Sequence, residues 1–410
     1  MPYIQRAITP ILKQRVSTSK CMLLVGARQV GKSTLIKHEF KDFNRANFDD
    51  RLTRMQAKEE PKLFFLNNPK PLFIDEVQKE SSILEDIKQI ADESDERGMF
   101  ILSGSQKLEL MKGMSESLAG RVSISELTGL SMREIYGVKF NRHFIPTDAY
   151  IKEREKEIVK YDNIWEIIHK GSYPELYDID RDWQEYYSSY VATYLERDIN
   201  ELVAADGITF TKFLTAVAAR TGELLNYSNI AGDVGVSEPT IKNWISILER
   251  TGIVYLLQPY SASALKRAIK TPKLYFRDTG LACYLTRWLT ADTLKCSAVA
   301  GNMFETFVVS EILKSYSNEG KDYRFNIFYY RGKDRNASGE NEIDLVIEED
   351  GVLYPVEIKM SGNPKVSMGA TNQVLDKVSD KKRGLGVILC LIDKKTYLRE
   401  NLVALPIEFI

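Results

Sequence analysis

Cysteine and histidine are scarce in this chain of 410 residues, which contains four cysteines and three histidines. No two cysteines form a CxxC pair, so neither a disulfide framework nor a zinc site is expected. The histidines have no spacing that would indicate a metal centre or a histidine-activated nucleophile. A zinc-dependent or histidine-based activity is therefore not expected. The residues concerned are Cys21, Cys283, Cys296, Cys390, His38, His143 and His169.

Long apolar runs and an excess of one charge are also absent. A membrane-spanning helix needs roughly 18 apolar residues, whereas residues 387–392, one of the longest apolar runs, have the length of a strand. The first 16 residues interleave apolar with polar and basic residues and lack the core of a signal peptide. Lys and Arg number 56 against 57 Asp and Glu, so any nucleic-acid contact must be local. We expect a cytoplasmic protein without a membrane partner.

The hydrophobic content, 44%, is ample for two or three domains. Between about residues 21 and 136, strand-length apolar runs alternate with helical stretches, as in a parallel sheet wrapped by helices. Residues 150–260 follow a helical period. Beyond residue 273, strands return around predicted helices at 301–316 and 365–378. The fold class is therefore α/β with a mostly helical middle, and we predict domains at 1–145, 146–270 and 271–410.

A phosphate-binding loop lies in the first region. Residues 26–34, GARQVGKST, match GxxxxGK[ST] between a predicted strand and a predicted helix. Glycines let successive N–H groups face the phosphates, and the helix N-terminus adds its dipole. We expect Lys32 to bridge the β- and γ-phosphates of ATP and Ser33 to bind Mg²⁺. The expected nucleotide-binding residues are Gly26, Ala27, Arg28, Gln29, Val30, Gly31, Lys32, Ser33 and Thr34.

Polar side chains follow the next two predicted strands. Asp75 comes directly after the apolar run at 72–74 and is the expected second ligand of Mg²⁺. Glu76 is placed to polarise the attacking water, which favours hydrolysis over simple nucleotide binding. After the strand at 99–102, Ser103 is the preferred γ-phosphate sensor, with Ser105 nearly equivalent. The first region is therefore predicted to hydrolyse ATP.

These motifs resemble those of prokaryotic AAA-type ATPases that carry an uncharacterised C-terminal domain. The resemblance covers nearly the whole chain, and its motifs are the phosphate loop, FIDEVQ (73–78), ILSGSQ (101–106), SLAGR (117–121) and YLERDI (194–199). It implies a five-stranded core and a catalytic glutamate, the role given above to Glu76. It also makes a homo-oligomer an expectation, in which Arg121 is a candidate arginine finger for its own or a neighbour's site; spacing alone fits a surface arginine equally well. At 171–175, Ser172 departs from the usual GGYPE motif.

The middle region contains a helix-turn-helix pattern. One short helix opens near Ser228, and Ser237 can cap a second helix at 238–250. Strands at 253–257 and 273–276 would complete a winged-helix-like unit. The residues between 261 and 277 contain five basic side chains and no acid, which suits phosphates, but the second helix mixes charges. Contact with DNA and a role in packing or protein contact both stay open. The five basic residues are Lys266, Arg267, Lys270, Lys273 and Arg277.

The C-terminal region contains an Asp-Gly pair, Asp350-Gly351, between two predicted strands at 343–347 and 352–358. Asp-Gly is the favoured pair for a two-residue hairpin turn. This register leaves Pro355 in a non-hydrogen-bonded pair, where its missing N–H does no harm. The cross-strand pairs that follow are Glu349 with Val352, Val346 with Pro355, and Asp344 with Glu357.

The predicted register brings acidic groups together. Asp344 and Glu357 repel each other unless a cation lies between them, and Lys359 shares their face. On the helix at 301–316, Glu305 falls inside the apolar arc, where it requires a partner; Glu311 does too, which weakens that signal. The order of these groups resembles the PD-(D/E)xK restriction-endonuclease-like fold.

That resemblance assigns roles to the four residues. It implies that Asp344 and Glu357 bind Mg²⁺ or Mn²⁺, that Lys359 orients water or neutralises the transition state, and that Glu305 supports the site. Three interpretations of this region stay open: an active phosphodiesterase, a degenerate nuclease fold used for binding, and a charged hairpin without a site. The whole chain is predicted to be an Mg²⁺-dependent ATPase that couples nucleotide state to DNA binding or cleavage. The alternative is an ATP-driven switch or scaffold that binds proteins.

Overall fold

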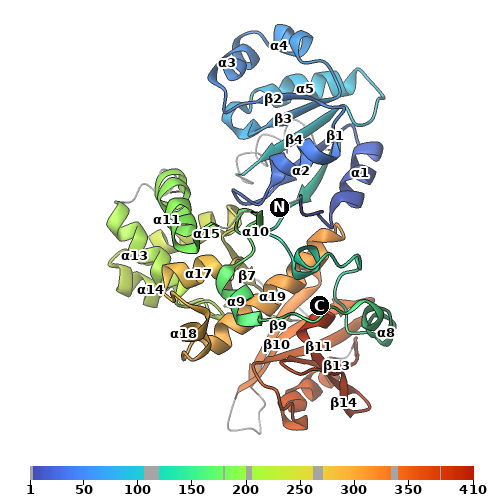
Figure 1. The fold of residues 1–410 in the computed structure, drawn as a ribbon, viewed down its shortest axis with the longest axis vertical. Coiled ribbons are helices and arrows are strands. Elements are labelled where there is room, and N and C mark those ends of the chain that lie inside the picture. The colour runs from blue at the N-terminus through green and yellow to red at the C-terminus, as the bar shows by residue number, and fades with distance from the viewer. Residues whose placement is uncertain are drawn as a thin grey trace.

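The computed structural model describes residues 3–105, 120–178, 181–199, 206–261, 271–333, 340–378 and 380–410. Figure 1 shows three parts: the blue N-terminal sheet with its helices at the top, green and yellow helices at the left, and the red C-terminal sheet below. Among the described residues, no helix combines the length and the apolar character needed to cross a membrane.

The N-terminal sheet is parallel and five-stranded, in the order β2-β3-β4-β1-β5, as the α/β prediction requires. Alternate residues of β1 face opposite sides, because successive side chains of a strand point to opposite faces. Leu23 packs in the core formed with α3 to α5, whereas Met22 and Leu24 pack with α1 and α2. Its elements are α1 (Thr9–Thr18), β1 (Cys21–Val25), α2 (Lys32–Glu39), β2 (Asn44–Asn47), α3 (Arg51–Glu59), α4 (Pro61–Asn67), β3 (Leu72–Asp75), η1 (Val77–Glu80), α5 (Ile83–Asp92), β4 (Phe100–Gly104), β5 (Val122–Glu126) and α7 (Met132–Ile135).

The middle part is mostly helical, as predicted. Ser237 caps α15 by accepting a hydrogen bond from Thr240 N–H, and Gly235 ends α14 with φ of 83°. The predicted strands β7 and β8 pair antiparallel, and β6 joins them. Its elements are α8 (Asp148–Arg154), η2 (Glu155–Glu157), α9 (Ile164–Lys170), α10 (Glu175–Asp178), α11 (Trp183–Tyr190), η3 (Val191–Ile199), α13 (Gly207–Ala218), β6 (Glu223–Leu224), α14 (Tyr227–Val234), α15 (Glu238–Arg250), β7 (Val254–Leu257), β8 (Lys273–Phe276), α17 (Thr279–Leu285) and α18 (Ala291–Lys295).

The C-terminal sheet has the order β14-β15-β13-β11-β10-β9, with β12 paired to β11. The segment predicted as a helix at 365–378 is a 3₁₀ stretch instead, so that prediction is wrong in type. Two residues of this stretch, Gly369 and Asn372, are packed against the sheet, and tertiary packing outweighs helical periodicity there. The elements are α19 (Ala300–Asn318), η4 (Tyr323–Phe325), β9 (Ile327–Lys333), β10 (Glu340–Glu349), β11 (Val352–Lys359), η5 (Val366–Lys377), β12 (Lys382–Arg383), β13 (Gly386–Cys390), β14 (Thr396–Arg399), β15 (Leu402–Pro406) and η6 (Ile407–Phe409).

Helix α19 lies at the junction of the three parts (Figure 1). Its Glu311 accepts a hydrogen bond of 2.8 Å from the N–H of Met132, which ties it to the N-terminal part. Its Thr306 bonds Thr221 of the middle part at 2.9 Å. Helix α19 is buried on nearly all sides. Its polar residues Glu311 and Thr306 form hydrogen bonds to the N-terminal part and to the middle part.

Candidate functional site

The phosphate loop runs between β1 and α2, as predicted. Gly31 precedes α2 with φ of 92°, and Gln29 also adopts positive φ, 62°. A Cβ at Gly26 would lie only 2.2 Å from the carbonyl oxygen of Leu127, so that position is restricted to glycine. The loop therefore has the backbone winding that a phosphate cradle requires.

Lys32 is buried at the start of α2 and points back into the loop. Its Nζ donates hydrogen bonds of 2.9 Å to the carbonyls of both Gly26 and Ala27. Burial lowers the pKa of Lys32 to about 8, although the nearby charges of Glu76 and Asp75 oppose this effect. Phosphate groups beside Lys32 would favour its charged form, so its environment fits an anionic ligand.

The two acidic residues after β3 have different partners. Asp75 accepts a hydrogen bond from Ser103 Oγ and is buried. Glu76 has positive φ, 54°, and accepts from Gln78 Nε2 and from Ser105 Oγ, the latter at 3.4 Å. Ser103 is fully buried against Asp75, so it orients that carboxylate, and Ser105 contacts Glu76. The two predicted γ-phosphate sensors, Ser103 and Ser105, thus contact the acidic residues Asp75 and Glu76 in this structure.

A cavity of about 860 Å³ adjoins the loop. It brings together residues from the loop, from the chain start and from the middle part, where Pro174, Glu175 and Asp178 form one wall. Its volume is within the usual range for ligand pockets, and it fits ATP. Of the residues predicted to bind the nucleotide, those that line it are Arg28, Gln29, Gly31, Lys32, Ser33 and Thr34, together with Glu76.

Arg6 supports the loop and was not predicted from the sequence. It is 3% exposed and donates to the carbonyl of Val30 at 2.8 Å and to that of Thr128 at 2.8 Å. Its Nε forms an ion pair of 2.9 Å with Glu134. The sequence indicated only the partner of Arg6: Ser131 and Glu134 have the spacing of a capping box, which they form at the start of α7.

Arg121 and the phosphate loop lie at opposite ends of strand β1. The N–H of Cys21, at the start of β1, bonds the carbonyl of Arg121, and its side chain pairs with Asp92 at the end of α5. The loop follows the other end of β1, a five-residue strand that spans about 16 Å. In this structure Arg121 therefore lies about the length of β1 away from the phosphate loop of its own chain. A role at a neighbour's site stays a prediction.

The predicted basic patch is also corrected in part. Lys273 is 4% exposed and pairs with Glu305 at 3.2 Å and Glu342 at 2.5 Å. Arg277 pairs with Glu126 at 2.6 Å. Both charges are satisfied internally and do not face solvent phosphates. Lys266, Arg267 and Lys270 lie outside the described residues.

The C-terminal hairpin has the predicted register. Glu349 pairs with Val352 and Val346 with Pro355, and the turn residues Asp350 and Gly351 have φ of 51° and 78°. This is the positive-φ turn that Asp-Gly favours. The register is thus set by the turn and confirmed across the strands.

Lys359 joins the two carboxylates that this register brings together. Its Nζ lies 2.8 Å from Asp344 Oδ2 and 2.8 Å from Glu357 Oε2. Asp344 Oδ2 also accepts from the N–H of Ile358 at 2.8 Å. The cation expected between the acids is therefore present as an ammonium group.

The electrostatics of this cluster favour additional positive charge. Burial, reinforced by the charge of Asp344, raises the pKa of Glu357 to about 8. Burial and Asp344 likewise raise the pKa of Glu305. Glu357 Oε1 is buried and has no hydrogen-bond partner among the described residues. An orphaned buried carboxylate oxygen is costly, and it is a ligand that divalent cations prefer.

Two residues of β8 complete the cluster and were not predicted. Lys273 Nζ and Tyr275 Oη donate to Glu305 Oε1 at 3.2 and 2.5 Å. The structure thus brings together Asp344, Glu357 and Lys359, whereas Glu305 contacts Lys273 and Tyr275 of β8. In the described parts of the chain, no three carboxylate, histidine or cysteine side chains form a ready-made metal cage. In this structure the position between Asp344 and Glu357 is taken by the Lys359 ammonium group.

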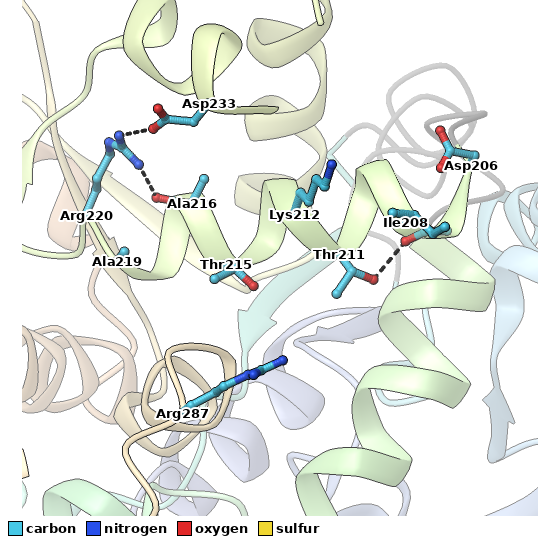
Figure 2. Close-up of a pocket in the computed structure, with 11 residues that line it drawn as sticks. Asp206, Ile208, Thr211, Lys212, Thr215, Ala216, Ala219, Arg220, Asp233 and Arg287 are labelled. Atoms are coloured by element: carbon cyan, nitrogen blue, oxygen red, sulfur yellow. Dashed lines mark hydrogen bonds and ion pairs between the residues drawn. The ribbon is translucent and has the colours of Figure 1, made fainter. Parts of the chain in front are cut away.

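A separate open groove of about 950 Å³ runs along α13. In Figure 2, Arg220 turns to Asp233 and to the carbonyl of Ala216, to which it donates at 2.8 Å, and Arg287 approaches from the end of α17. The lining carries charges of both signs, with Asp206 and Asp233 beside Lys212, Arg220 and Arg287. The groove therefore lacks the one-signed lining of a phosphate track.

Three protein families match consecutive parts of the chain. Residues 18–136 match an AAA domain. Residues 161–292 match a domain of unknown function (DUF8612), and residues 300–410 match another (DUF4143). The AAA match and the strand order of the N-terminal sheet together identify this part as an AAA-type P-loop ATPase domain.

Similar proteins occur in mycobacteria. Uncharacterized proteins of Mycobacterium bovis and Mycobacterium tuberculosis are each 26% identical over 375 residues, which cover 89% of this chain and 76% of theirs. A solved Walker-type ATPase of Pyrococcus abyssi is 15% identical, covers 68% of this chain and 94% of its own, and superposes with a TM-score of 0.43. At that score the likeness is weak, so the fold assignment rests on the strand order.

Proposed function

We propose that the protein is an Mg²⁺-dependent ATPase whose nucleotide state controls action on DNA at the C-terminal cluster. The observation that carries the ATPase activity is the placement of Lys32 in the loop beside Asp75 and Glu76. Lys32 binds the phosphates, and Ser33 and Asp75 are the residues that would hold Mg²⁺, which supplies charge neutralisation. Glu76 accepts the proton of the attacking water, and its carboxylate is held in place by hydrogen bonds from Gln78 and Ser105.

Contacts between the parts support the coupling. Glu126, the last residue of β5, is paired in register with Val25, the last residue before the phosphate loop. It forms the ion pair with Arg277, which follows β8. Gly252 lies next to Ala27, so that an added Cβ would be in ordinary van der Waals contact with the Ala27 backbone nitrogen, at 3.6 Å. A change of the loop on ATP binding therefore meets the middle part directly.

The C-terminal cluster supports the DNA part of the proposal. Asp344 and Glu357 would hold Mg²⁺ or Mn²⁺, which when bound would polarise a phosphodiester. Lys359 would then move from the carboxylates toward the developing negative charge. Glu305 keeps the far side of the cluster acidic. The unpaired oxygen of Glu357 supports a cation here.

A second candidate is an ATP-driven switch that binds proteins through a degenerate nuclease-like domain. The observation that favours it is the placement of Lys359, whose ammonium group already pairs with both carboxylates. In addition, Lys242 on the exposed face of α15 pairs with Glu238 at 2.7 Å, so this helix offers DNA little free positive charge.

A binding assay with a salt series separates the two candidates. Phosphate contacts make the logarithm of DNA affinity fall linearly with the logarithm of salt concentration. We expect measurable DNA binding at low salt that weakens steeply between 50 and 200 mM salt and differs between the ATP-bound and nucleotide-free protein, roughly as expected for several phosphate contacts. No binding to any DNA at low salt, in either nucleotide state, would leave the switch as the better account.

A further inference from the structure

The C-terminal cluster is built from two parts of the chain. Asp344, Glu357 and Lys359 come from the hairpin and Glu305 from α19, whereas Lys273 and Tyr275 come from β8, which belongs to the sheet of the middle part. Residues two apart on a strand share a face, so Lys273 and Tyr275 reach Glu305 side by side.

The contacts of Glu305 are concentrated on one oxygen. Lys273 Nζ donates to Oε1 at 3.2 Å, and Tyr275 Oη donates to the same atom at 2.5 Å. Lys273 also pairs with Glu342, two residues before Asp344 on β10. Lys273 therefore fixes both the helix carboxylate and the strand that carries Asp344.

The charges of the cluster are arranged in two similar units. Lys359 lies between Asp344 and Glu357, and Lys273 lies between Glu305 and Glu342. Two lysines face four carboxylates, so the cluster has a net formal charge of −2 when all groups are ionised. Lys273 has only 5% of its side chain exposed, so it cannot leave this position without breaking both pairs.

We infer that Lys273 and Tyr275 are positioning residues of the C-terminal cation site, which is therefore complete only while β8 is docked on α19. This rests on the proposed function, because the site must first bind a cation. Neither residue binds the cation; both hold Glu305, and Lys273 also holds Glu342, two residues before Asp344 on β10. The site is thus shared between the middle part and the C-terminal part.

Two explanations of the role of Lys273 predict opposite changes in cation affinity when its side chain is removed. If Lys273 acted only through its charge, its removal would reduce the repulsion of a divalent cation and tighten binding. A positioning role predicts weaker binding, because Glu305 and β10 lose their shared anchor. Tyr275→Phe separates position from charge entirely, since it removes one hydroxyl and leaves the net charge unchanged.

The test is Mn²⁺ affinity of the full-length, nucleotide-free protein, measured from the free Mn²⁺ signal in electron paramagnetic resonance. We expect Kd to rise about three- to tenfold for Tyr275→Phe, as for the loss of one hydrogen bond to a charged group. Lys273→Gln should weaken binding and Lys273→Arg should restore it in part. Lys242→Gln, an exposed lysine on α15 with one ion pair, is the matched control.

A double-mutant cycle isolates the route through Glu305. Tyr275→Phe should add little on a Glu305→Gln background, because the group that it positions has already been changed. Wild-type affinity in Tyr275→Phe, or tighter binding in Lys273→Gln, would overturn the inference while the cation site stands. Absence of Mn²⁺ binding in the wild type would overturn both the cation site and the inference. Melting temperatures of each variant distinguish weak binding from misfolding.

Discussion

Arg277 and Glu126 form an ion pair of 2.6 Å. Arg277 directly follows β8 of the middle part, and Glu126 ends β5 beside the phosphate loop. Arg277 also contacts Tyr323, just before the C-terminal sheet. One half-buried guanidinium thus connects the middle part to residues of the two other parts. Its planar fork makes several directed bonds, which a lysine cannot reproduce.

Arg277→Lys is therefore expected to weaken communication between the nucleotide and the C-terminal part. Hydrogen–deuterium exchange should show that a non-hydrolysable ATP analogue slows amide exchange in β8 and α19 of the wild type. In the variant we expect less than half of that change. Arg324→Lys is the matched control, because Arg324 is paired with Asp322 but 60% of its side chain is exposed. An undiminished response in Arg277→Lys would contradict the route.

The buried pair of Arg6 and Glu134 should contribute to stability in a pH-dependent manner. Burial alone would raise the pKa of Glu134, but the charge of Arg6 and the hydrogen bonds from Ser131 and Ala7 outweigh it and lower this pKa. Glu134→Gln leaves Arg6 buried without its counter-charge, which should cost about 3 to 5 kcal/mol at pH 7. Denaturant unfolding measures this difference.

The sign of the pH effect follows from the lowered pKa. The contribution of Glu134 is fully present above the unfolded-state pKa, near 4.3, and is lost as pH falls through the folded-state pKa. The difference between wild type and Glu134→Gln should therefore shrink at acid pH. Glu153→Gln, at an exposed pair with Arg142, should cost less than about 1 kcal/mol. A pH-independent difference would contradict the account of Glu134.

Arg121 can act only on a neighbouring chain if it is a finger. In that case ATP turnover per protomer should rise with protein concentration, and mixing Arg121→Ala with Lys32→Ala should restore part of the activity, because a Lys32→Ala protomer can supply Arg121 to the intact phosphate loop of an Arg121→Ala protomer. Arg97→Ala removes an exposed arginine near the same sheet edge and should leave turnover unchanged. Concentration-independent turnover without rescue would make Arg121 a structural partner of Asp92.

The hairpin site predicts stabilisation by a divalent cation. Mn²⁺ should raise the melting temperature of the full-length protein in proportion to the occupancy of the site, and Asp344→Asn should remove this shift. Lys359→Ala should keep much of the binding but lose metal-dependent DNA cleavage. Asp350→Asn, at the exposed turn of the same hairpin, is the control. If millimolar Mn²⁺ does not shift the melting temperature, the cluster is an internally paired group of charges without a metal site.

Local patterns allowed much of this architecture to be predicted. The phosphate loop is a contiguous motif, and the Asp350-Gly351 turn determined the hairpin register with the help of Pro355. In both, the information lies within a few residues. Ser237 at the start of α15 is another such case, since its capping bond reaches only to Thr240.

Long-range pairs were not predictable in this way. Lys273 and Arg277 were predicted to belong to a basic patch because residues 261–277 contain no acid. Lys273 instead pairs with Glu342, 69 positions away, and Arg277 pairs with Glu126, 151 positions away. Arg6 finds Glu134 at a separation of 128. Such pairs depend on how the parts dock, and one sequence does not contain that information. The 3₁₀ form of η5 has the same origin in packing.

ATP turnover by the wild type and by Glu76→Gln, measured with saturating ATP and Mg²⁺, tests the central claim most directly. We expect wild-type hydrolysis that needs Mg²⁺, and a loss of about a hundredfold or more in Glu76→Gln, the usual contribution of a general base. Nucleotide binding should persist in that variant and disappear in Lys32→Ala, which removes the phosphate contact. Hydrolysis by Glu76→Gln at the wild-type rate, or none by the wild type, would contradict the account.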